Sequence, residues 1–282
     1  MYITDETIDR LIREDIPYLD LTTHILNIRE RKGTIRFTSR QKAVISGTDI
    51  VARIFEKLGI RIINIIPSGT GVEAGEIFIE AQGTAQSLHM AWKVSINILE
   101  YCSGIATRTR TLVDSAKKIN PKIEVVTTRK VFPGTKELSI KAILDGGALP
   151  HRLGLSETIL IFKQHAVFLG GVDGLLGELE KIKERVCEKK VVVEVECRED
   201  AIKLCHARIN ALQFDKIPPE KLKEIVNDIR KINFGITLIS TGGINAENIE
   251  AYAAAGVDVI NTSSVYFGKP VDIGVEIKRV DL

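Results

Sequence analysis

Residues 211–243, with the sequence ALQFDKIPPEKLKEIVNDIRKINFGITLISTGG, decide the expected fold. An apolar run at 211–214 is typical of a buried strand, a helical stretch follows at 219–232, and a second apolar run occupies 236–239. A strand, a helix and another strand in this order form a right-handed βαβ unit with parallel strands. This part of the chain therefore predicts an α/β fold.

The same alternation extends over the C-terminal half of the chain, where helical stretches such as 178–186 separate further apolar runs. The other expected strands are residues 123–126, 158–162, 191–195 and 257–260. Because most of these runs are almost continuously apolar, we expect a parallel sheet that is buried on both faces.

Polar residues follow the ends of these strands one after another. They are Arg129 with Lys130, Lys163, Glu194 with Glu196, Asp215, the run 240–243 and the run 262–264. Groups from so many strand ends can converge only if the sheet curls, because the carboxyl ends of barrel strands share one rim. We therefore expect an incomplete parallel β/α barrel of six or seven strands. An open doubly wound sheet is the alternative.

The first hundred residues mix helices and strands without strict alternation, which is typical of a small α+β domain. Thr4 and Thr48 are the expected N-caps of two helices, and a long helix should begin near Gln86. Strands are expected at 33–39, 42–47, 60–66 and 76–82. We assign residues 1–108 to an N-terminal sandwich domain and 109–269 to the barrel, and we expect 270–282 to pack back on the N-terminal domain.

The charge balance argues against a nucleic-acid partner. The 282 residues contain 39 Lys+Arg and 37 Asp+Glu, a net charge of +2, so the molecule has no overall polycationic field. The acidic N-terminus does not resemble a signal peptide, and no apolar run is long enough to cross a membrane.

The four cysteines predict a reducing compartment. Cys102, Cys187, Cys197 and Cys205 form no C-x-x-C pair and no spacing typical of a zinc site or a disulfide framework. We therefore expect reduced packing residues in a cytoplasmic protein.

Five basic residues lie at or beside strand ends: Arg129, Lys130, His151, Arg152 and Lys163. Crowded together without partners they would be unfavourable, so an anionic ligand is the natural partner. The alternative is a set of scattered surface charges. The run 146–150 before His151 is a tight loop that could also present His151 and Arg152 inward.

Two acidic residues and a glycine-rich loop complete the candidate site. Glu196 and Asp215 end adjacent strands and could hold Mg²⁺ together with a phosphorylated substrate, or could simply neutralise the cations. The segment 239–248, ISTGGINAEN, joins a strand to a helix through Gly242 and Gly243. Backbone N–H groups there can approach a phosphate, although paired glycines also occur in ordinary turns.

Together these segments resemble the quinolinate (nicotinate-nucleotide) phosphoribosyltransferase family. The matching motifs are DLTT at 20–23, SGIAT at 103–107, TRK at 128–130, GGALPHRLGL at 146–155, EVE at 194–196, STGGIN at 240–245, GVDVI at 256–260 and DIG at 272–274. They span nearly the whole chain. PYLDLTT at 17–23 and RKVFPGTK at 129–136 look closest to the ModD branch, which is associated with molybdenum-transport genes.

The resemblance implies a phosphoribosyltransferase that joins a carboxylated aromatic acceptor, quinolinate in the family's case, to phosphoribosyl pyrophosphate. It also implies a homodimer, or a hexamer built from dimers, in which each N-terminal domain caps the partner's barrel. Residues expected to bind the acceptor are Arg129, His151 and Arg152. Those expected at the phosphoribosyl donor are Lys130, Lys163, Glu196 and Asp215, with Ser240, Thr241, Gly242, Gly243 and Ser263 around the 5′-phosphate. Glu196 and Asp215 are also the expected Mg²⁺ ligands.

Several positions depart from the family pattern. Lys93 stands where an arginine reaches into the neighbouring active site, and Arg-to-Lys loses bidentate carboxylate recognition. The other departures are Thr127, Gln164 with His165, Ile239 and Ser263. Two further functions remain alternatives: a sugar-phosphate aldolase or epimerase with Lys163 as the Schiff base, and a non-catalytic anion-binding protein linked to molybdenum transport.

Overall fold

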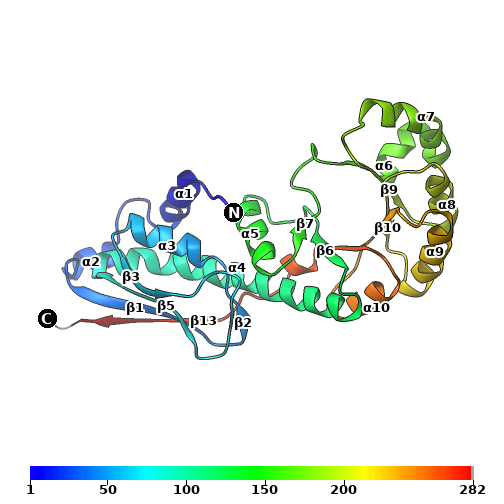
Figure 1. The fold of residues 1–282 in the computed structure, drawn as a ribbon. Coiled ribbons are helices and arrows are strands. Elements are labelled where there is room, and N and C mark those ends of the chain that lie inside the picture. The colour runs from blue at the N-terminus through cyan, green and yellow to red at the C-terminus, as the bar shows by residue number, and fades with distance from the viewer. Residues whose placement is uncertain (281–282) are drawn as a thin grey trace. The chain divides into compact units, whose positions relative to one another are not determined.

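The structure, a computed structural model, describes residues 1–280 and divides into two compact units (Figure 1). Unit 2 comprises residues 111–131 and 148–265. Unit 1 comprises residues 1–110, residues 132–147 and the C-terminal segment from Tyr266. The segment 132–147, assigned to the barrel in the sequence analysis, therefore folds with unit 1.

Unit 2 is built on a seven-stranded parallel sheet, in the order β7-β6-β12-β11-β10-β9-β8. Its strands are β6 (Glu124–Thr127), β7 (Leu149–Pro150), β8 (Ile159–Ile161), β9 (Val191–Val195), β10 (Ala211–Asp215), β11 (Thr237–Thr241) and β12 (Val259–Thr262). Within residues 1–280 the two edge strands β7 and β8 pair with one neighbour each, so the barrel is incomplete. The predicted α/β class and incomplete parallel barrel are confirmed.

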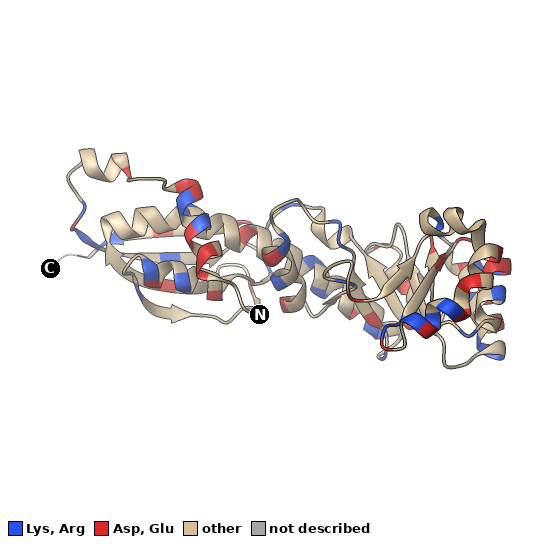
Figure 2. Cartoon of the chain, turned by 90° about the horizontal axis from the view of Figure 1, so that it is seen from above, with Lys and Arg blue, Asp and Glu red and all other residues tan. Residues whose placement is uncertain are grey.

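Helices follow the barrel strands. They are α6 (Lys163–Ala166), α7 (Gly171–Arg185), α8 (Arg198–His206), α9 (Pro219–Ile232) and α10 (Ile249–Ala254), with short 3₁₀ turns η1 (Val167–Leu169) and η2 (Ser264–Tyr266). In α9 the buried positions Leu222, Ile225, Val226 and Ile229 recur at the spacing of one helix face. The opposite face carries charges, and Figure 2 shows both signs interspersed over the helices of both units.

Unit 1 is a four-stranded antiparallel sheet in the order β13-β1-β5-β3, with a separate β2–β4 pair. Its strands are β1 (Lys32–Ser39), β2 (Ala43–Val44), β3 (Arg61–Ile65), β4 (Gly71–Val72), β5 (Ile77–Thr84) and β13 (Ile273–Arg279). Its helices are α1 (Asp5–Asp15), α2 (Leu21–Ile25), α3 (Thr48–Lys57), most of α4 (Ala85–Ile119) and α5 (Lys136–Asp145). Alternate residues of β1 are buried, so one face of this sheet covers a core.

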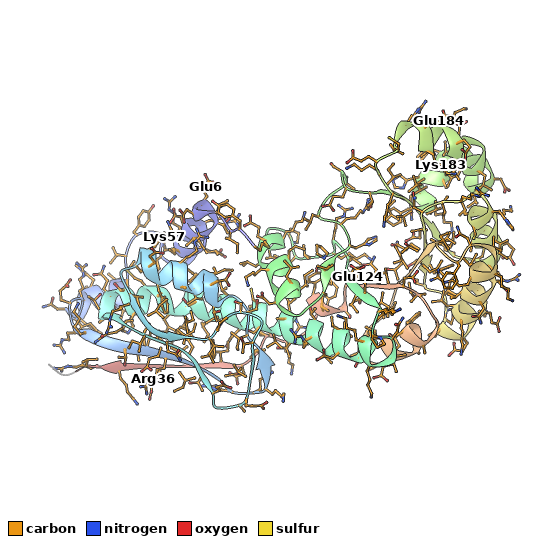
Figure 3. All side chains as sticks on the ribbon, in the orientation of Figure 1. Glu6, Arg36, Lys57, Glu124, Lys183 and Glu184 are labelled. Carbon is orange, nitrogen blue, oxygen red and sulfur yellow. The ribbon has the colours of Figure 1, made fainter. Side chains whose placement is uncertain are left out.

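The other face of the unit 1 sheet is polar. Arg36 of β1, labelled in Figure 3, pairs with Glu80 of β5 at 2.6 Å between Nη2 and Oε1. Such cross-strand pairs of opposite charge support the register of the two strands.

The start of α3 differs from the expectation. Thr4 caps α1 as predicted, because its side chain accepts a hydrogen bond from the Thr7 amide. Thr48, however, is the first residue of α3, and its predicted role as N-cap is wrong. Gly47 is the N-cap, with φ at +91° and the position of a Cβ only 3.0 Å from Ile98 Cγ2, a conformation and a space that suit glycine.

The cysteines agree only in part with their predicted role. All four are free thiols, and Cys102 and Cys205 are buried packing residues. Burial raises the pKa of Cys102 to about 12, which keeps it protonated and unreactive. Cys187 is exposed and therefore packs no core. Among the described residues, no helix is both long and apolar enough to cross a membrane.

A buried ionic cluster anchors residues 132–147 in unit 1. Lys141 Nζ lies 2.6 Å from Asp145 Oδ2 and 3.2 Å from Asp49 Oδ1, and the lysine side chain is only 7% exposed. Ser46 Oγ donates to Asp145 Oδ2 at 2.6 Å. Because Asp49 and Ser46 come from distant parts of the sequence, this cluster determines where α5 packs.

Replacing Lys141 by Met should destabilise unit 1 by about 3 kcal/mol, because it leaves a poorly solvated carboxylate without its partner. The exposed pair Lys42–Glu73 provides the control, and Lys42→Met should cost less than ~1 kcal/mol. Urea unfolding followed by fluorescence of the single tryptophan, Trp92 of unit 1, measures both. Equal effects of the two substitutions would contradict the anchoring role of the cluster.

Candidate functional site

The interior of the barrel is layered. Six buried residues on six strands form one apolar cluster: Val126, Leu160, Val192, Ala211, Ile239 and Val259. Alternate residues of a strand face the same side, so the residues two positions further on form the next layer toward the carboxyl ends. They are Thr128, Phe162, Glu194, Gln213, Thr241 and Asn261, and we call these six residues the floor. The floor follows the tilt of the strands, because Gln213 pairs with Ile239 across β10–β11 and Asn261 pairs with Val126 across β12–β6.

Charged residues lie immediately beyond the floor, where the strands end. Lys163, after β8, forms an ion pair with Glu196, after β9, at 2.9 Å between Nζ and Oε2. Hydrogen bonding to Glu196 raises the pKa of Lys163, so the amine is held in its charged form. Two residues predicted at the donor site are thus in contact.

Charges from opposite parts of the sheet act on one another across the interior. Burial raises the pKa of Glu194, and the neighbouring charges of Asp215 and Glu196 act in the same direction. A hydrogen bond from Gln213 and the positive charge of Lys130 oppose this shift. Lys130 follows β6, whereas Glu194 is in β9, and three strands lie between β6 and β9 in the sheet order. An influence of Lys130 on Glu194 across three intervening strands is consistent with a curled sheet.

A cationic cluster lies beside β6 and β7. Arg152 is only 6% exposed, and its Nη1 reaches the Thr158 carbonyl at 3.4 Å. Burial lowers the pKa of Arg152, as does the charge of Arg129, while Glu157 opposes them. Burial, assisted by Arg152, also lowers the pKa of His151. An anion bound between these three residues would relieve their mutual repulsion.

His151 has a polar atom available for such a ligand. Its Nε2 is buried and has no hydrogen-bond partner within the described residues. Its amide donates to the Thr127 carbonyl at 2.9 Å, which continues the β6–β7 ladder and fixes the backbone. The ladder therefore holds His151 and Arg152 beside the strand that leads into Arg129 and Lys130.

The turn after β11 requires glycine at position 242. Gly242 has φ at +89°, and a Cβ there would lie 2.6 Å from Asp215 Oδ1 and 2.9 Å from the Lys216 amide nitrogen. The Lys216 amide donates to the Thr241 carbonyl at 2.9 Å, so the turns after β10 and β11 are bound together. Gly243, with φ at +73°, has open space where a Cβ would be. The glycine loop thus adjoins Asp215.

Two predicted side chains are not brought to this site. Ser240 pairs with Phe214 and Ile260, so its side chain lies on the opposite face of the sheet from Thr241. Lys93 belongs to α4 in unit 1, where its Nζ lies 4.4 Å from the centroid of the Trp92 ring. Ser263, directly after β12, is half-buried.

Two floor residues, Gln213 and Asn261, were not predicted as site residues, and Glu194 was noted at its strand end without a role. Gln213 and Asn261 are 2% and 4% exposed, and each has a carbonyl oxygen without a hydrogen-bond partner in residues 1–280. For Gln213 the available signal was a polar residue inside an otherwise apolar strand, two positions before the strand end.

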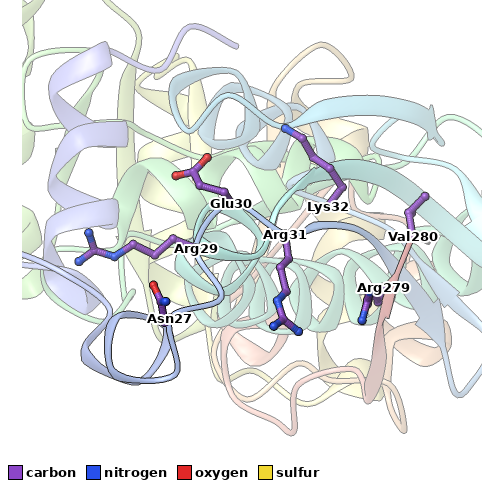
Figure 4. Close-up of a pocket in the computed structure, with 7 residues that line it drawn as sticks. All are labelled: Asn27, Arg29, Glu30, Arg31, Lys32, Arg279 and Val280. Carbon is purple, nitrogen blue, oxygen red and sulfur yellow. The ribbon is translucent and has the colours of Figure 1, made fainter. Parts of the chain in front are cut away.

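A second feature that the sequence analysis missed is a pocket in unit 1 (Figure 4). It has a volume of about 430 Å³ and lies between the start of β1 and the end of β13. Its lining is basic, with Arg29, Arg31, Lys32 and Arg279 beside Asn27, Glu30 and Val280. None of the residues predicted for the site lines it.

Comparison with known proteins identifies the family. The family model described as "Quinolinate phosphoribosyl transferase, C-terminal domain" matches residues 105–276. The corresponding N-terminal domain matches residues 20–103. The chain belongs to the quinolinate phosphoribosyltransferase family, and its enzyme class is that of the pentosyltransferases.

Individual relatives are similar to this chain over nearly its full length. The chain is 34% identical over 278 residues to the Escherichia coli protein named "Putative pyrophosphorylase ModD", covering 99% of this chain and 98% of that one. It is 29% identical to a protein of Methanothermobacter thermautotrophicus named for nicotinate-nucleotide pyrophosphorylase activity, over 97% and 98% of the two chains. The crystal structure of NadC from Streptococcus pyogenes has the same fold, with a TM-score of 0.90, 22% identity and full coverage of both chains.

The nicotinate-nucleotide pyrophosphorylase structure from Francisella tularensis is also similar, with a TM-score of 0.88, 25% identity and 98% coverage of each chain. These matches agree with the resemblance inferred from the sequence motifs, including that to the ModD branch.

Replacing Gly242 by Ala should destabilise unit 2 by about 3 kcal/mol. The left-handed backbone would be strained by any Cβ, and the new methyl group would also overlap with Asp215 and Lys216. Gly243→Ala is the matched control and should cost only ~1 kcal/mol, because the space is open and only the backbone conformation is strained. Urea unfolding followed by far-ultraviolet circular dichroism measures both variants. A Gly243→Ala variant as unstable as Gly242→Ala would show that the Asp215 contact is not the cause.

His151 should make stability depend on pH. Its folded pKa is below the ordinary value of 6.5, so the unfolded chain binds more protons between those two values. The contribution of His151 to the free energy of unfolding therefore rises with pH between the two pKa values, and it is complete above about pH 7. The free energy of unfolding of wild type minus that of His151→Gln should increase from pH 5 to pH 7 and then level off. The total increase should be ~1.4 kcal/mol for each unit by which burial lowers the pKa of His151. A difference that falls with pH would contradict the burial of His151.

Proposed function

We propose that this enzyme transfers the phosphoribosyl group of phosphoribosyl pyrophosphate to a ring nitrogen of a carboxylated aromatic acceptor and releases pyrophosphate. Quinolinate, with decarboxylation of the product to nicotinate mononucleotide, is the reference acceptor for the family. The observation that carries the proposal is the pairing of two sites around one floor: a cationic cluster beside β6 and β7, and an acidic site with a glycine turn beside β9 to β11.

The acceptor would bind at the cationic cluster. Arg129 and Arg152 can each present a planar guanidinium to a carboxylate, and His151 Nε2 can add a hydrogen bond. In the free protein these groups repel one another. The carboxylates would therefore be the species that completes this part of the site, and they would orient the ring nitrogen toward the donor.

The donor would bind on the other side, with its ribose near Glu196 and Asp215 and its 5′-phosphate at Thr241, Gly242 and Gly243. The positive-φ glycines leave backbone N–H groups accessible to a phosphate. Lys130 and Lys163 supply positive charge for the departing pyrophosphate. The ring nitrogen would donate its electron pair to ribose C1′ as the bond from C1′ to the pyrophosphate oxygen breaks.

The residues present fit a magnesium ion. Among residues 1–280, no group of three or more His, Cys, Asp or Glu side chains is arranged to hold a metal alone. Mg²⁺ commonly uses one or two carboxylates and takes its remaining ligands from substrate phosphates and water. Glu196 and Asp215 would be those carboxylates, and when bound the ion would neutralise charge on the pyrophosphate.

We further propose a homodimer, or a hexamer of dimers, in a cytoplasmic enzyme. The segment 18–26 of unit 1 exposes an apolar surface suited to a partner subunit: Tyr18, Leu19, Leu21, Ile25 and Leu26 are 50–92% exposed. Lys93, on α4 of unit 1, would act in the partner's site. The free thiols suit a reducing compartment. Any link with molybdenum transport rests on the ModD relatives.

The two alternatives are less well supported. A Schiff-base aldolase needs a neutral amine, but Lys163 is ion-paired with Glu196 and its pKa is raised. A non-catalytic anion-binding protein would not need the acidic residues opposite the cationic cluster. Membership of the phosphoribosyltransferase family also favours an enzyme.

The test is pyrophosphate release from phosphoribosyl pyrophosphate with Mg²⁺ and a panel of carboxylated heterocycles that includes quinolinate. Lys163→Ala should lower kcat/KM by about 10²-fold or more, because it removes a positive charge that would neutralise the departing pyrophosphate. Lys181→Ala is the matched control, since Lys181 is similarly exposed and paired with a glutamate but lies on the outer helix α7. No pyrophosphate with any acceptor, or equal activities of the two variants, would contradict the proposal.

A further inference from the structure

The floor contains two hydrogen-bond acceptors that the protein leaves without donors. Gln213 Oε1 on β10 and Asn261 Oδ1 on β12 are buried and have no partner within the described part of the chain. A buried carbonyl oxygen without a donor costs about 1–3 kcal/mol. Two such groups on one face of one barrel are unfavourable for folding, and a ligand bound on the floor would supply the missing donors.

The orientation of the Gln213 amide follows from its neighbour. Its Nε2 donates to Glu194 Oε2 at 2.8 Å. Turning the amide around would place the carbonyl oxygen against a carboxylate and break this bond. The oxygen of Gln213 is therefore the atom left without a partner, and it needs a donor from outside the protein.

The position of the two amides places them under the proposed acceptor. Gln213 lies two residues before Asp215, and Asn261 pairs with Thr241 on one side and with Val126 on the other. Asn261 is thus next to the strand that leads into Arg129 and Lys130. The apolar layer of Ile239 and Val259 closes the barrel beneath them. A molecule held by the cationic cluster would rest on these amides.

We propose that Gln213 and Asn261 select an acceptor that carries hydrogen-bond donors, namely a nitrogen heterocycle with a carboxylate and an amino, hydroxyl or N–H group on the edge that meets the floor. This inference rests on the proposed function and defines its substrate class. The chemistry of transfer is unchanged: the ring nitrogen attacks C1′ and pyrophosphate leaves. An acceptor whose floor-facing edge has only C–H groups, as in quinolinate, leaves both oxygens unpaired.

The size of the preference follows from desolvation. A site that hydrogen-bonds a substrate OH or NH group rejects the analogue that lacks it strongly, because the buried partners stay unsatisfied. With two carbonyl oxygens involved, the matched donor-bearing acceptor should be preferred by about 100-fold or more in kcat/KM.

The experiment compares pairs of pyridine carboxylates that differ only in having an amino or hydroxyl group in place of hydrogen. The wild type should prefer the substituted member of at least one pair in pyrophosphate release and in calorimetric affinity. Gln213→Met and Asn261→Leu, which keep side-chain volume, should each remove ~10-fold or more of that preference. The readout is the ratio of kcat/KM for the two members of a pair, not the rate with either member alone.

Ser95→Ala is the matched control. Ser95 is a fully buried residue of unit 1 whose hydroxyl also has no partner in the described chain, so its removal should leave acceptor preference unchanged. Melting temperature gives a reading independent of turnover. Asn261→Leu should melt no lower than wild type, since it removes an unsatisfied polar atom without creating a cavity. Gln213→Met also removes the hydrogen bond to Glu194 and should therefore melt lower.

Different results would overturn the two proposals. Absence of pyrophosphate release with every acceptor contradicts the phosphoribosyltransferase proposal. Calorimetry then still tests selection by the floor, because it compares the affinities for the two members of each pair without turnover. Equal affinity for both members of every pair, or variants that weaken both members equally, contradicts selection by the floor. A strongly lowered melting temperature of Asn261→Leu also contradicts it, because that amide would then have a structural role instead.

Discussion

The rest of the site depends on one constraint, the shared register of seven parallel strands. Once β9, β10, β11 and β12 are aligned, every second side chain must face the interior. This rule stacks an apolar layer, a polar floor and a charged edge in that order. A slip of one residue in any strand would move its functional side chain to the helix-covered face, where Ser240 already lies. Hydrophobic burial of the apolar layer is therefore also what positions the charges.

The sequence predicts this barrel well for a physical reason. A parallel strand covered on both faces is an almost continuous apolar run, and Val191–Val195 and Ala211–Asp215 are nearly unambiguous examples. β7 escaped prediction because Leu149–Pro150 is only two residues long and follows two glycines, which suggest a loop. Thr48 was misassigned because a threonine before an apolar run is the usual cap, whereas close packing against Ile98 selected Gly47 instead.

The residues of the candidate site likewise divide into those that the sequence reveals and those that it does not. Charged residues at strand ends are visible in the sequence because they interrupt apolar runs. Whether a buried amide such as Gln213 or Asn261 is satisfied depends on its neighbours in space, so no sequence pattern reveals it. The electrostatic influence of Lys130 on Glu194 likewise depends on curvature, which pairing order alone does not specify. The packing of residues 132–147 with unit 1 depends on contacts of Lys141 and Asp145 with residues about a hundred positions away.

That packing has a consequence for how the enzyme can be divided. β6 and β7 are neighbours in the barrel, yet the segment between them folds with the other unit. A gene fragment encoding only residues 111–265 would carry α5 away from Asp49 and Ser46, and would leave the ammonium of Lys141 with part of its ionic environment missing. Neither unit is thus a contiguous module that recombination could transplant intact. The chain is best regarded as a single inheritable piece, because the segment that joins two barrel strands belongs to the other unit.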